Sequence, residues 1–300
     1  MSELLWGIDL GGTKIEGVAL HIQPELKIVE RLRVPTEAQL GYEHILDQIQ
    51  LLIQMIREKT GQEPGKLGIG TPGIIDTETH LIKNSNTICL INQPMREDLE
   101  KRFNIPVRMA NDANCFAAAE AQLGAVPKVA KNPEVVFGVI MGTGVGGGIV
   151  VNGKIINGKH GIGGEWGHNM LDPEGDPCYC GKRGCVETYI SGPACERYYQ
   201  KISGGSLKMA DIYKRYLERD PKAVETIERL IHYFGRSLAT IINILDPEVI
   251  VLGGGLGNLD VLYHEGREEV KKYVFNYDLK TLFVKPSLGD SAGVIGAALL

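Results

Sequence analysis

One histidine and three cysteines form the strongest chemical signal in this 300-residue sequence. Cys178, Cys180 and Cys185 fall within eight residues, and His168 lies ten residues before the first of them. One nitrogen and three sulfur ligands suit tetrahedral Zn²⁺, and four protein ligands leave no open position for a reacting water. The spacing therefore predicts a structural zinc site that holds a loop together.

Two carboxylates are tied to the same loop. Glu165 precedes His168 by three residues, and Glu187 follows Cys185 by two. A zinc-bound imidazole usually gives its second ring N–H to an oxygen, and carboxylates accept hydrogen bonds from hydroxyl groups. These residues are therefore candidate ligands of a hydroxyl-bearing substrate, although each glutamate is equally compatible with a solvated position on the loop.

Three glycine-rich segments each follow a β-rich stretch: Gly7–Lys14, Gly142–Gly148 and Leu252–Asn258. Successive backbone N–H groups at such a turn point into one concavity that suits phosphate oxygens. Thr13 and Thr143 add hydroxyl donors, and Asp9 places a carboxylate where a phosphate-bridging Mg²⁺ takes a direct or water-mediated partner. For any one of the three segments, a tight turn without a ligand is the alternative.

Two other nucleotide-binding folds are disfavoured. Gly142, Gly144 and Gly147 match G-x-G-x-x-G, but that dinucleotide fingerprint requires a helix directly after the glycines. Residues 149–158 instead alternate with period two and contain two Asn-Gly pairs, which predicts a hairpin. No G-x-x-x-x-G-K-[ST] is present, which excludes a P-loop protein.

Asn111 and Asp112 lie where a predicted strand (105–112) meets an alanine-rich predicted helix (113–123). An aspartate at such a junction is a common helix N-cap. The chemical alternative is a base, because phosphoryl transfer needs mainly positioning and charge neutralisation, with one carboxylate orienting the attacking hydroxyl.

The elements that must position these groups repeat along the chain. A predicted hairpin (4–20) precedes an amphipathic helix (42–59) and a buried strand (66–70). After a polar, proline-containing break at 127–133, strand, glycine turn and strand recur over 135–153. A long helix (224–245), stopped by Asp246-Pro247, precedes a strand over 248–255. The repetition predicts a duplicated α/β unit with a ligand in the cleft between the halves.

Composition is that of a soluble globular protein, with 43% hydrophobic and 23% charged residues. A net charge of −5 argues against nucleic-acid and anionic-membrane partners. The sequence shows no secretory signal and no membrane-length apolar run, so we expect a cytoplasmic protein with reduced thiols. Cys89, Cys115 and Cys195 stand apart from the cluster and are expected to be small buried residues.

Several of these segments resemble a known superfamily. "GIDLGGTK", "MGTGVGGG" and "VLGGGLG" resemble the first phosphate, second phosphate and adenosine motifs of the sugar kinase, actin and Hsp70 superfamily. "GKHGIGGEWGH" followed by "CYCGKRGC" is similar to the signature of its ROK branch (repressors, open reading frames and kinases). Within that branch, "VRMANDANCFA" and "PCYCGKRGCVETYISG" most resemble the bacterial fructokinase/mannokinase group. The likeness extends over essentially the whole chain.

This resemblance implies an α/β fold of two ribonuclease-H-like (actin-like ATPase) domains with an interdomain active-site cleft and a zinc-bound loop. We expect an N-terminal domain over 1–120, completed by a helix over 290–300, and a C-terminal domain over 121–289. The implied activity is ATP-dependent phosphorylation of a hexose 6-hydroxyl, with Mg²⁺ accompanying ATP and with zinc as a structural ion. Fructose or mannose is favoured, and glucose, N-acetylglucosamine and N-acetylmannosamine are the alternatives. A homodimer is the expected assembly.

The resemblance also assigns residues. Asp112 matches the catalytic aspartate of the family. The implied sugar contacts are Gly73, Asn86, Asn111, Asp112, Glu165, His168 and Glu187. The implied nucleotide and magnesium contacts are Asp9, Gly11, Gly12, Thr13, Lys14, Gly142, Thr143, Gly144, Gly254 and Gly255. Selectivity among sugars is expected to lie in residues 83–94 and nearby loops.

Two rival functions share part of the pattern. A sugar-responsive ROK regulator would carry a DNA-binding domain before the first phosphate motif, but Asp9 is the ninth residue here, and the negative charge supplies no basic patch. An actin- or chaperone-like ATPase shares the glycine turns, but it has no need of glutamates and a histidine tethered to zinc. The sequence therefore favours the kinase.

Overall fold

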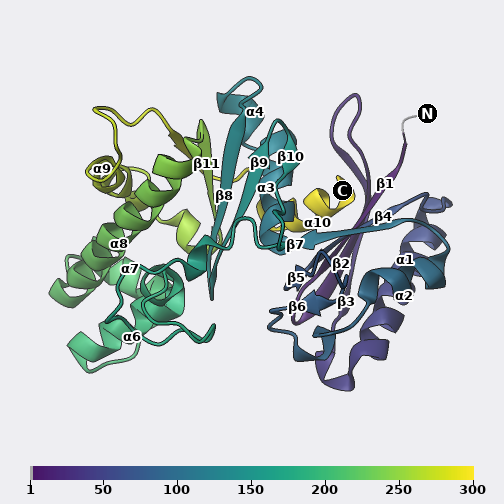
Figure 1. Ribbon diagram of the computed structural model, residues 1–300, viewed down its shortest axis with the longest axis horizontal. Helices are drawn as coiled ribbons and strands as arrows, with labels where there is room; N and C mark the ends of the chain where they lie inside the picture. The colour runs from purple at the N-terminus through teal and green to yellow at the C-terminus, as the bar shows by residue number, and fades with distance from the viewer. Residues whose placement is uncertain (1–2) are drawn as a thin grey trace. The chain divides into compact units, whose positions relative to one another are not determined.

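The computed structural model describes residues 3–300 and divides into two units (Figure 1). Unit 1 comprises the chain up to Pro127, Gly153–Gly163 and Ser287–Leu300, and unit 2 comprises Lys128–Asn152 and Gly164–Pro286. The division expected from the sequence differs from this one at residues 121–127, 153–163 and 287–289. Residues 121–127 continue unit 1, and residues 153–163 return to it, where the Gln122 side chain donates a hydrogen bond to the Gly153 carbonyl at 3.1 Å.

Unit 1 is built on a sheet with the strand order β3-β2-β1-β4-β7. The strands are β1 (Leu5–Leu10), β2 (Lys14–His21), β3 (Lys27–Pro35), β4 (Leu67–Thr71) and β7 (Val107–Asn111). The first three are antiparallel neighbours, whereas β4 and β7 run parallel to β1. The hairpin, the helix α1 (Tyr42–Thr60) and the strand β4 follow the sequence prediction to within one or two residues.

Helices cover both faces of this sheet (Figure 1). On one face, α1 buries the apolar stripe predicted from its helical spacing. On the other lie α3 (Asp112–Gln122) and the C-terminal α10 (Ala292–Ala298). Glycine permits close approach there, since a Cβ at Gly68 would lie 1.8 Å from the Ala297 carbonyl oxygen. The chain's last helix therefore completes the unit formed by its first residues.

Four strands of unit 2 repeat the order and directions of β2, β1, β4 and β7. Its strands β8 (Val135–Met141) and β9 (Val145–Val151) form an antiparallel pair, and β11 (Val249–Gly253) and β12 (Leu282–Val284) add to β8 in parallel. Because β9 rather than a helix follows the glycines, the dinucleotide fingerprint is excluded. Its longer helices are α6 (Gly192–Ser203), α7 (Met209–Leu217), α8 (Pro221–Leu245) and α9 (Glu265–Lys271).

The remaining elements are short. They are β5 (Ile74–Ile75), β6 (Ile82–Lys83), β10 (Lys154–Ile155), α2 (Met95–Phe103), α4 (Val126–Val129), α5 (Glu187–Ile190) and the 3₁₀ turns η1 (Ala38–Leu40), η2 (Ile88–Leu90), η3 (Trp166–His168), η4 (Gly255–Asn258), η5 (Asp260–Leu262) and η6 (Gly289–Ser291). The break expected at 127–133 thus overlaps a single helical turn. Among residues 3–300, no helix has the length and apolar character needed to cross a bilayer.

Candidate active site

Three parallel strands of unit 1 end at one edge of the sheet, and this edge carries the candidate carboxylates. Asp9 pairs in register with Gly70 of β4, and Thr71 of β4 pairs with Asn111 of β7. Asp9 near the end of β1, the turn that leaves β4 and Asp112 directly after β7 therefore lie at the same edge. The sequence predicted each group separately, and the strand pairing brings them together.

Both carboxyl groups at this edge bind protons more tightly than usual. Burial, followed by the negative charges of Asp112 and Glu16, raises the pKa of Asp9 to about 6, against the opposing charge of Lys14. Desolvation by the surrounding protein also raises the pKa of Asp112, against the backbone hydrogen bond from Ala113. Raised carboxyl pKa values at a polar edge are typical of functional sites.

Asp112 is not the helix cap that one interpretation of the sequence predicted. The Asn111 side chain takes that role, because its Oδ1 accepts a hydrogen bond from the Asn114 backbone N–H at 2.8 Å. Asp112 is the first residue of α3, and its Oδ1 accepts from the next backbone N–H, that of Ala113, at 2.7 Å. Since Asn111 satisfies the capping requirement, the carboxylate of Asp112 is available for another role.

The first glycine turn leaves its backbone open to solvent. The Gly11 N–H donates to the Lys14 carbonyl at 3.0 Å, and the Thr36 hydroxyl donates to the Gly11 carbonyl at 2.6 Å. Gly12, Thr13 and Lys14 are exposed. The hydrogen bonds at Gly11 thus fix the turn, and the exposed residues Gly12–Lys14 remain accessible to a ligand, as a phosphate-binding turn requires.

The turn after β4 brings two further predicted sugar contacts close together. Gly73 has φ of 117°, which favours glycine, and an added Cβ would lie 2.9 Å from the Ser85 Cβ. Ser85 donates its hydroxyl hydrogen bond to the Pro72 carbonyl at 2.6 Å. Asn86 follows Ser85 and is exposed. Gly73 and Asn86 therefore belong to one local cluster of unit 1.

In unit 2, the second and third glycine turns lie together. The Gly142 N–H donates to the Gly144 carbonyl at 2.9 Å, and the Thr143 side chain is exposed. Gly254 has φ of 76°, and a Cβ there would lie 2.3 Å from the Met141 carbonyl oxygen, which directly precedes the second turn. Gly255 is exposed beside it. The motifs that resemble phosphate and adenosine sites thus share one end of the unit 2 sheet.

Glu187 links the loop of the candidate zinc ligands (residues 168–185) to the second glycine turn through a hydrogen bond. Its Oε2 accepts a hydrogen bond from the Val145 N–H at 2.9 Å, and a Cβ at Gly144 would lie 2.7 Å from the same oxygen. Glu187 is also the first residue of α5, two residues after Cys185. Its carboxylate therefore has a fixed position on the protein and is not a freely solvated loop group.

The predicted metal ligands do converge. Ligand atoms of His168, Cys178, Cys180 and Cys185 all lie within 4.8 Å of one another. Cys180 Sγ is 3.6 Å from Cys185 Sγ, and Cys178 Sγ is 3.6 Å from His168 Nδ1. Sulfurs bound to zinc at ~2.3 Å in a tetrahedron lie ~3.8 Å apart. The donor set and its spacing therefore fit a closed zinc site.

Tyr179 is a residue that sequence reasoning missed at this loop. His168 Nδ1 faces the cysteines. The other ring nitrogen, Nε2, was expected to contact a sugar, and in the structure it lies 3.1 Å from the Tyr179 hydroxyl. The Tyr179 side chain is 80% exposed. Its position between two cysteine ligands was the available signal. Glu165 lies on the same loop, where its carbonyl accepts from the His168 N–H at 3.2 Å.

The isolated cysteines behave largely as expected. Cys115 and Cys195 are buried, whereas Cys89 is only partly buried.

The duplicated sheets, the glycine turn in each hairpin, the carboxylate at a strand end and the His-Cys₃ cluster agree with the sugar-kinase class that the sequence motifs resemble. A family model described as "ROK family" matches residues 5–300, and the chain belongs to that family.

Proteins similar in sequence and in structure agree with this class. The chain is 37% identical to an N-acetyl-D-glucosamine kinase of Histophilus somni, with 99% of this chain and 98% of that protein covered. It superposes on a ROK hexokinase from Thermus thermophilus with a TM-score of 0.88 and 31% identity, covering 99% and 97% of the two chains. A ROK glucokinase from Streptomyces griseus, solved with glucose and AMPPNP, gives 0.79 and 27%, covering 99% and 98%.

Proposed function

We propose that this sugar kinase transfers the γ-phosphoryl group of ATP to the 6-hydroxyl of N-acetyl-D-glucosamine. The observation that carries the choice of sugar is the set of full-length relatives at 36–37% identity that bear the name N-acetyl-D-glucosamine kinase. None of these relatives bears the name of a fructokinase or a mannokinase, the group that the motifs resemble. N-acetylglucosamine, an alternative acceptor in the sequence analysis, therefore replaces fructose and mannose as the proposed acceptor.

In the proposed mechanism, Asp112 accepts the proton of the sugar hydroxyl as that oxygen attacks the γ-phosphorus. A carboxylate with a raised pKa is a stronger base near neutral pH, and the capping role of Asn111 leaves it free to act. Mg²⁺, when bound with ATP, neutralises the phosphate charges. Asp9 would hold that ion directly or through water, and the exposed turn at Gly11–Lys14 would donate backbone N–H groups to phosphate oxygens.

The sugar contacts in this proposal are the residues that the motif resemblance implies: Gly73, Asn86, Asn111, Glu165, His168 and Glu187. A zinc ion bound by His168 and the three cysteines would keep the loop that carries Glu165 and His168 rigid. Gly142–Gly144 and Gly254–Gly255 would contact the nucleotide. The motif resemblance supports these assignments, as do the fixed position of Glu187 and the convergence of the zinc ligands.

A substrate panel tests the choice of sugar. We expect N-acetylglucosamine to give a kcat/KM at least tenfold above those of N-acetylmannosamine, glucose, fructose and mannose in a coupled ADP assay with Mg·ATP. Preference for fructose or mannose would restore the motif-based grouping and refute the proposal. Hydrolysis of ATP that no sugar stimulates would favour the actin-like ATPase instead.

The proposal also includes the assembly and compartment expected from the sequence, a homodimer in the cytoplasm. Light scattering coupled to size exclusion tests the first, with a mass of twice 32.8 kDa as the expected result.

A further inference from the structure

Unit 1 contains a cavity of about 460 Å³, and Asn111 is the one residue of its lining that the proposed function uses. The lining includes every residue of β7 from Val107 to Asn111, together with Ile74, Ile155 and Asn157. Its volume falls within the ~300–1,000 Å³ typical of small-molecule sites. It is also far larger than the ~10–15 Å³ that one water molecule requires.

Two buried polar atoms on this cavity's lining residues have no partner. Asn114 is 2% exposed, and its Oδ1 makes no hydrogen bond with any part of the chain that the structure describes. Its Nδ2 donates to Asn157 Oδ1 at 3.4 Å, so the amide is oriented from the other side. The buried Nε of Arg96 likewise has no acceptor within residues 3–300. Such atoms are rare in folded proteins and mark places where a ligand or water completes the bonding.

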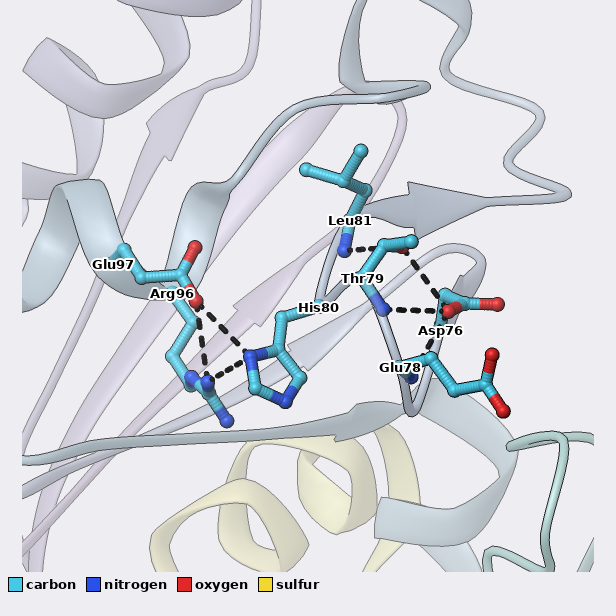
Figure 2. A network of polar contacts seen from close by, with 7 residues as sticks. All are labelled: Asp76, Glu78, Thr79, His80, Leu81, Arg96 and Glu97. Atoms are coloured by element: carbon cyan, nitrogen blue, oxygen red, sulfur yellow. Dashed lines mark hydrogen bonds and ion pairs between the residues drawn. The ribbon is translucent and has the colours of Figure 1, made fainter.

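The charged groups around the cavity already have partners. Arg96 Nη2 lies 3.2 Å from Glu97 Oε1 and 2.8 Å from His80 Nδ1, as Figure 2 shows. Asp76 accepts from Thr79 in the same view and pairs with Lys83 at 2.7 Å. Because the charges of Arg96 and Asp76 are compensated within the protein, an uncharged ligand fits beside them. Arg108, which also lines the cavity, donates a hydrogen bond to the Leu300 carbonyl at 3.2 Å.

The remaining surface is amphipathic. Ile74, Ile75, Met109 and Ile155 supply apolar wall, whereas Asn114 Oδ1 requires a donor and Arg96 Nε requires an acceptor. Hydroxyl and amide groups supply both functions, and the C–H faces of a sugar ring suit the apolar wall. An uncharged pyranose ring therefore matches the cavity better than an acetamido group alone, which would leave most of the volume empty.

We propose that the cavity binds a second, uncharged sugar ring joined to the acceptor hexose at a position other than its 6-hydroxyl. The kinase would then accept disaccharides of N-acetylhexosamines as well as the monosaccharide. This inference rests on the proposed function, since it takes Asn111 as a sugar contact. Asn111 is the last residue of β7 on the cavity wall and directly precedes Asp112, so an acceptor held there lies next to the cavity.

The test compares N-acetylglucosamine with its β-1,4-linked disaccharide, N,N′-diacetylchitobiose, in the full-length enzyme. We expect the wild-type kcat/KM values for the two sugars to agree within tenfold. Ile155→Trp fills the cavity and is expected to raise KM for the disaccharide at least tenfold, with less than a twofold change for the monosaccharide. Ile244→Trp, which alters an exposed isoleucine of α8 in unit 2, is the matched control and should change neither value.

A second variant tests the polar contact without filling the cavity. Arg96→Lys keeps a positive charge near Glu97 but removes the Nε donor, so it should raise KM for the disaccharide alone. Turnover of the monosaccharide without turnover or calorimetric binding of the disaccharide would refute the inference. So would equal effects of Ile155→Trp on both sugars. If N-acetylglucosamine itself is not phosphorylated, the proposed function fails, and calorimetric binding of the disaccharide that Ile155→Trp abolishes would still identify the cavity as a sugar site.

Discussion

Replacing Asp9 by asparagine should stabilise the protein and at the same time abolish its activity. Asp9 is partly buried near the end of β1, and two glycines make room for its carboxylate. An added Cβ at Gly293 would lie 3.0 Å from Oδ2, and one at Gly70 would lie 3.5 Å from Oδ1. Asparagine has nearly the same shape as aspartate, so it fits this space without its charge.

The size of the effect follows from the pKa of Asp9. Its pKa rises from 3.8 to about 6, so the folded state binds this proton more tightly than the unfolded state does. A group with a raised carboxyl pKa lowers stability as pH rises between these two values, and the loss is complete above the higher one. A shift of about 2 units corresponds to ~3 kcal/mol as an upper limit. We therefore expect Asp9→Asn to gain up to ~3 kcal/mol at pH 7.5 and about a third of that at pH 4.5.

Scanning calorimetry without Mg²⁺ or nucleotide measures this gain. For a domain of this size, ~3 kcal/mol corresponds to a rise in Tm on the order of 5–10 °C. Asp76→Asn is the matched control with the opposite sign, because the Lys83 ion pair and the Thr79 and Glu78 backbone N–H groups hold the pKa of Asp76 well below its usual range. That variant should lower Tm at pH 7.5. An unchanged or lower Tm for Asp9→Asn at pH 7.5, or an equal gain at both pH values, would show that the ionised Asp9 carboxylate does not destabilise the folded protein.

Three further substitutions test the site and its support. Asp112→Asn should keep the fold, because Asn111 caps α3, and should lower kcat by roughly 10²–10⁴; near-wild-type turnover in the coupled ADP assay would remove Asp112 from its role. His168→Ala should lose zinc, measured by elemental analysis, and raise the sugar KM, whereas full zinc content with normal kinetics would break the proposed link between loop and substrate. Glu120→Gln should cost about 1–3 kcal/mol in urea denaturation, because the buried Glu120 carboxylate accepts hydrogen bonds from the Ala125, Ser287 and Leu288 backbone N–H groups. If hydrogen exchange in residues 287–300 did not become faster in that variant, Glu120 would not be what fastens the C-terminal segment.

Local pattern was sufficient to predict the elements and the His-Cys₃ cluster. The spacing of apolar residues in α1 and α8 determines helices whose buried faces can be named in advance. The Asn152-Gly153 pair ends β9 in a turn, as predicted. His168 and the three cysteines lie within 18 residues of one another in the sequence, so their residue types and spacing were enough to predict that they converge. In each case, the relevant interactions are between near neighbours along the chain.

The carboxylates show where local pattern was insufficient. Asp112 follows a strand and begins a helix, and from the sequence it was as good a cap as a base. The Asn114 N–H donates its hydrogen bond to Asn111 Oδ1, which excludes Asp112 as the cap and leaves its role as the base a proposal. The pKa of Asp9 likewise depends on Asp112, a residue more than a hundred positions away.

The sequence by itself therefore determined the residue types, their local elements and the family. The tertiary structure decided which strand ends share an edge, where residues 153–163 and 287–300 pack, and that Tyr179 meets the outer nitrogen of His168. The physical reason is that strand pairing, burial and proton affinity each sum contributions from segments far apart in the chain. Periodicity and spacing describe only residues that are close in the sequence. The contributions of distant segments arise only when folding brings those segments together.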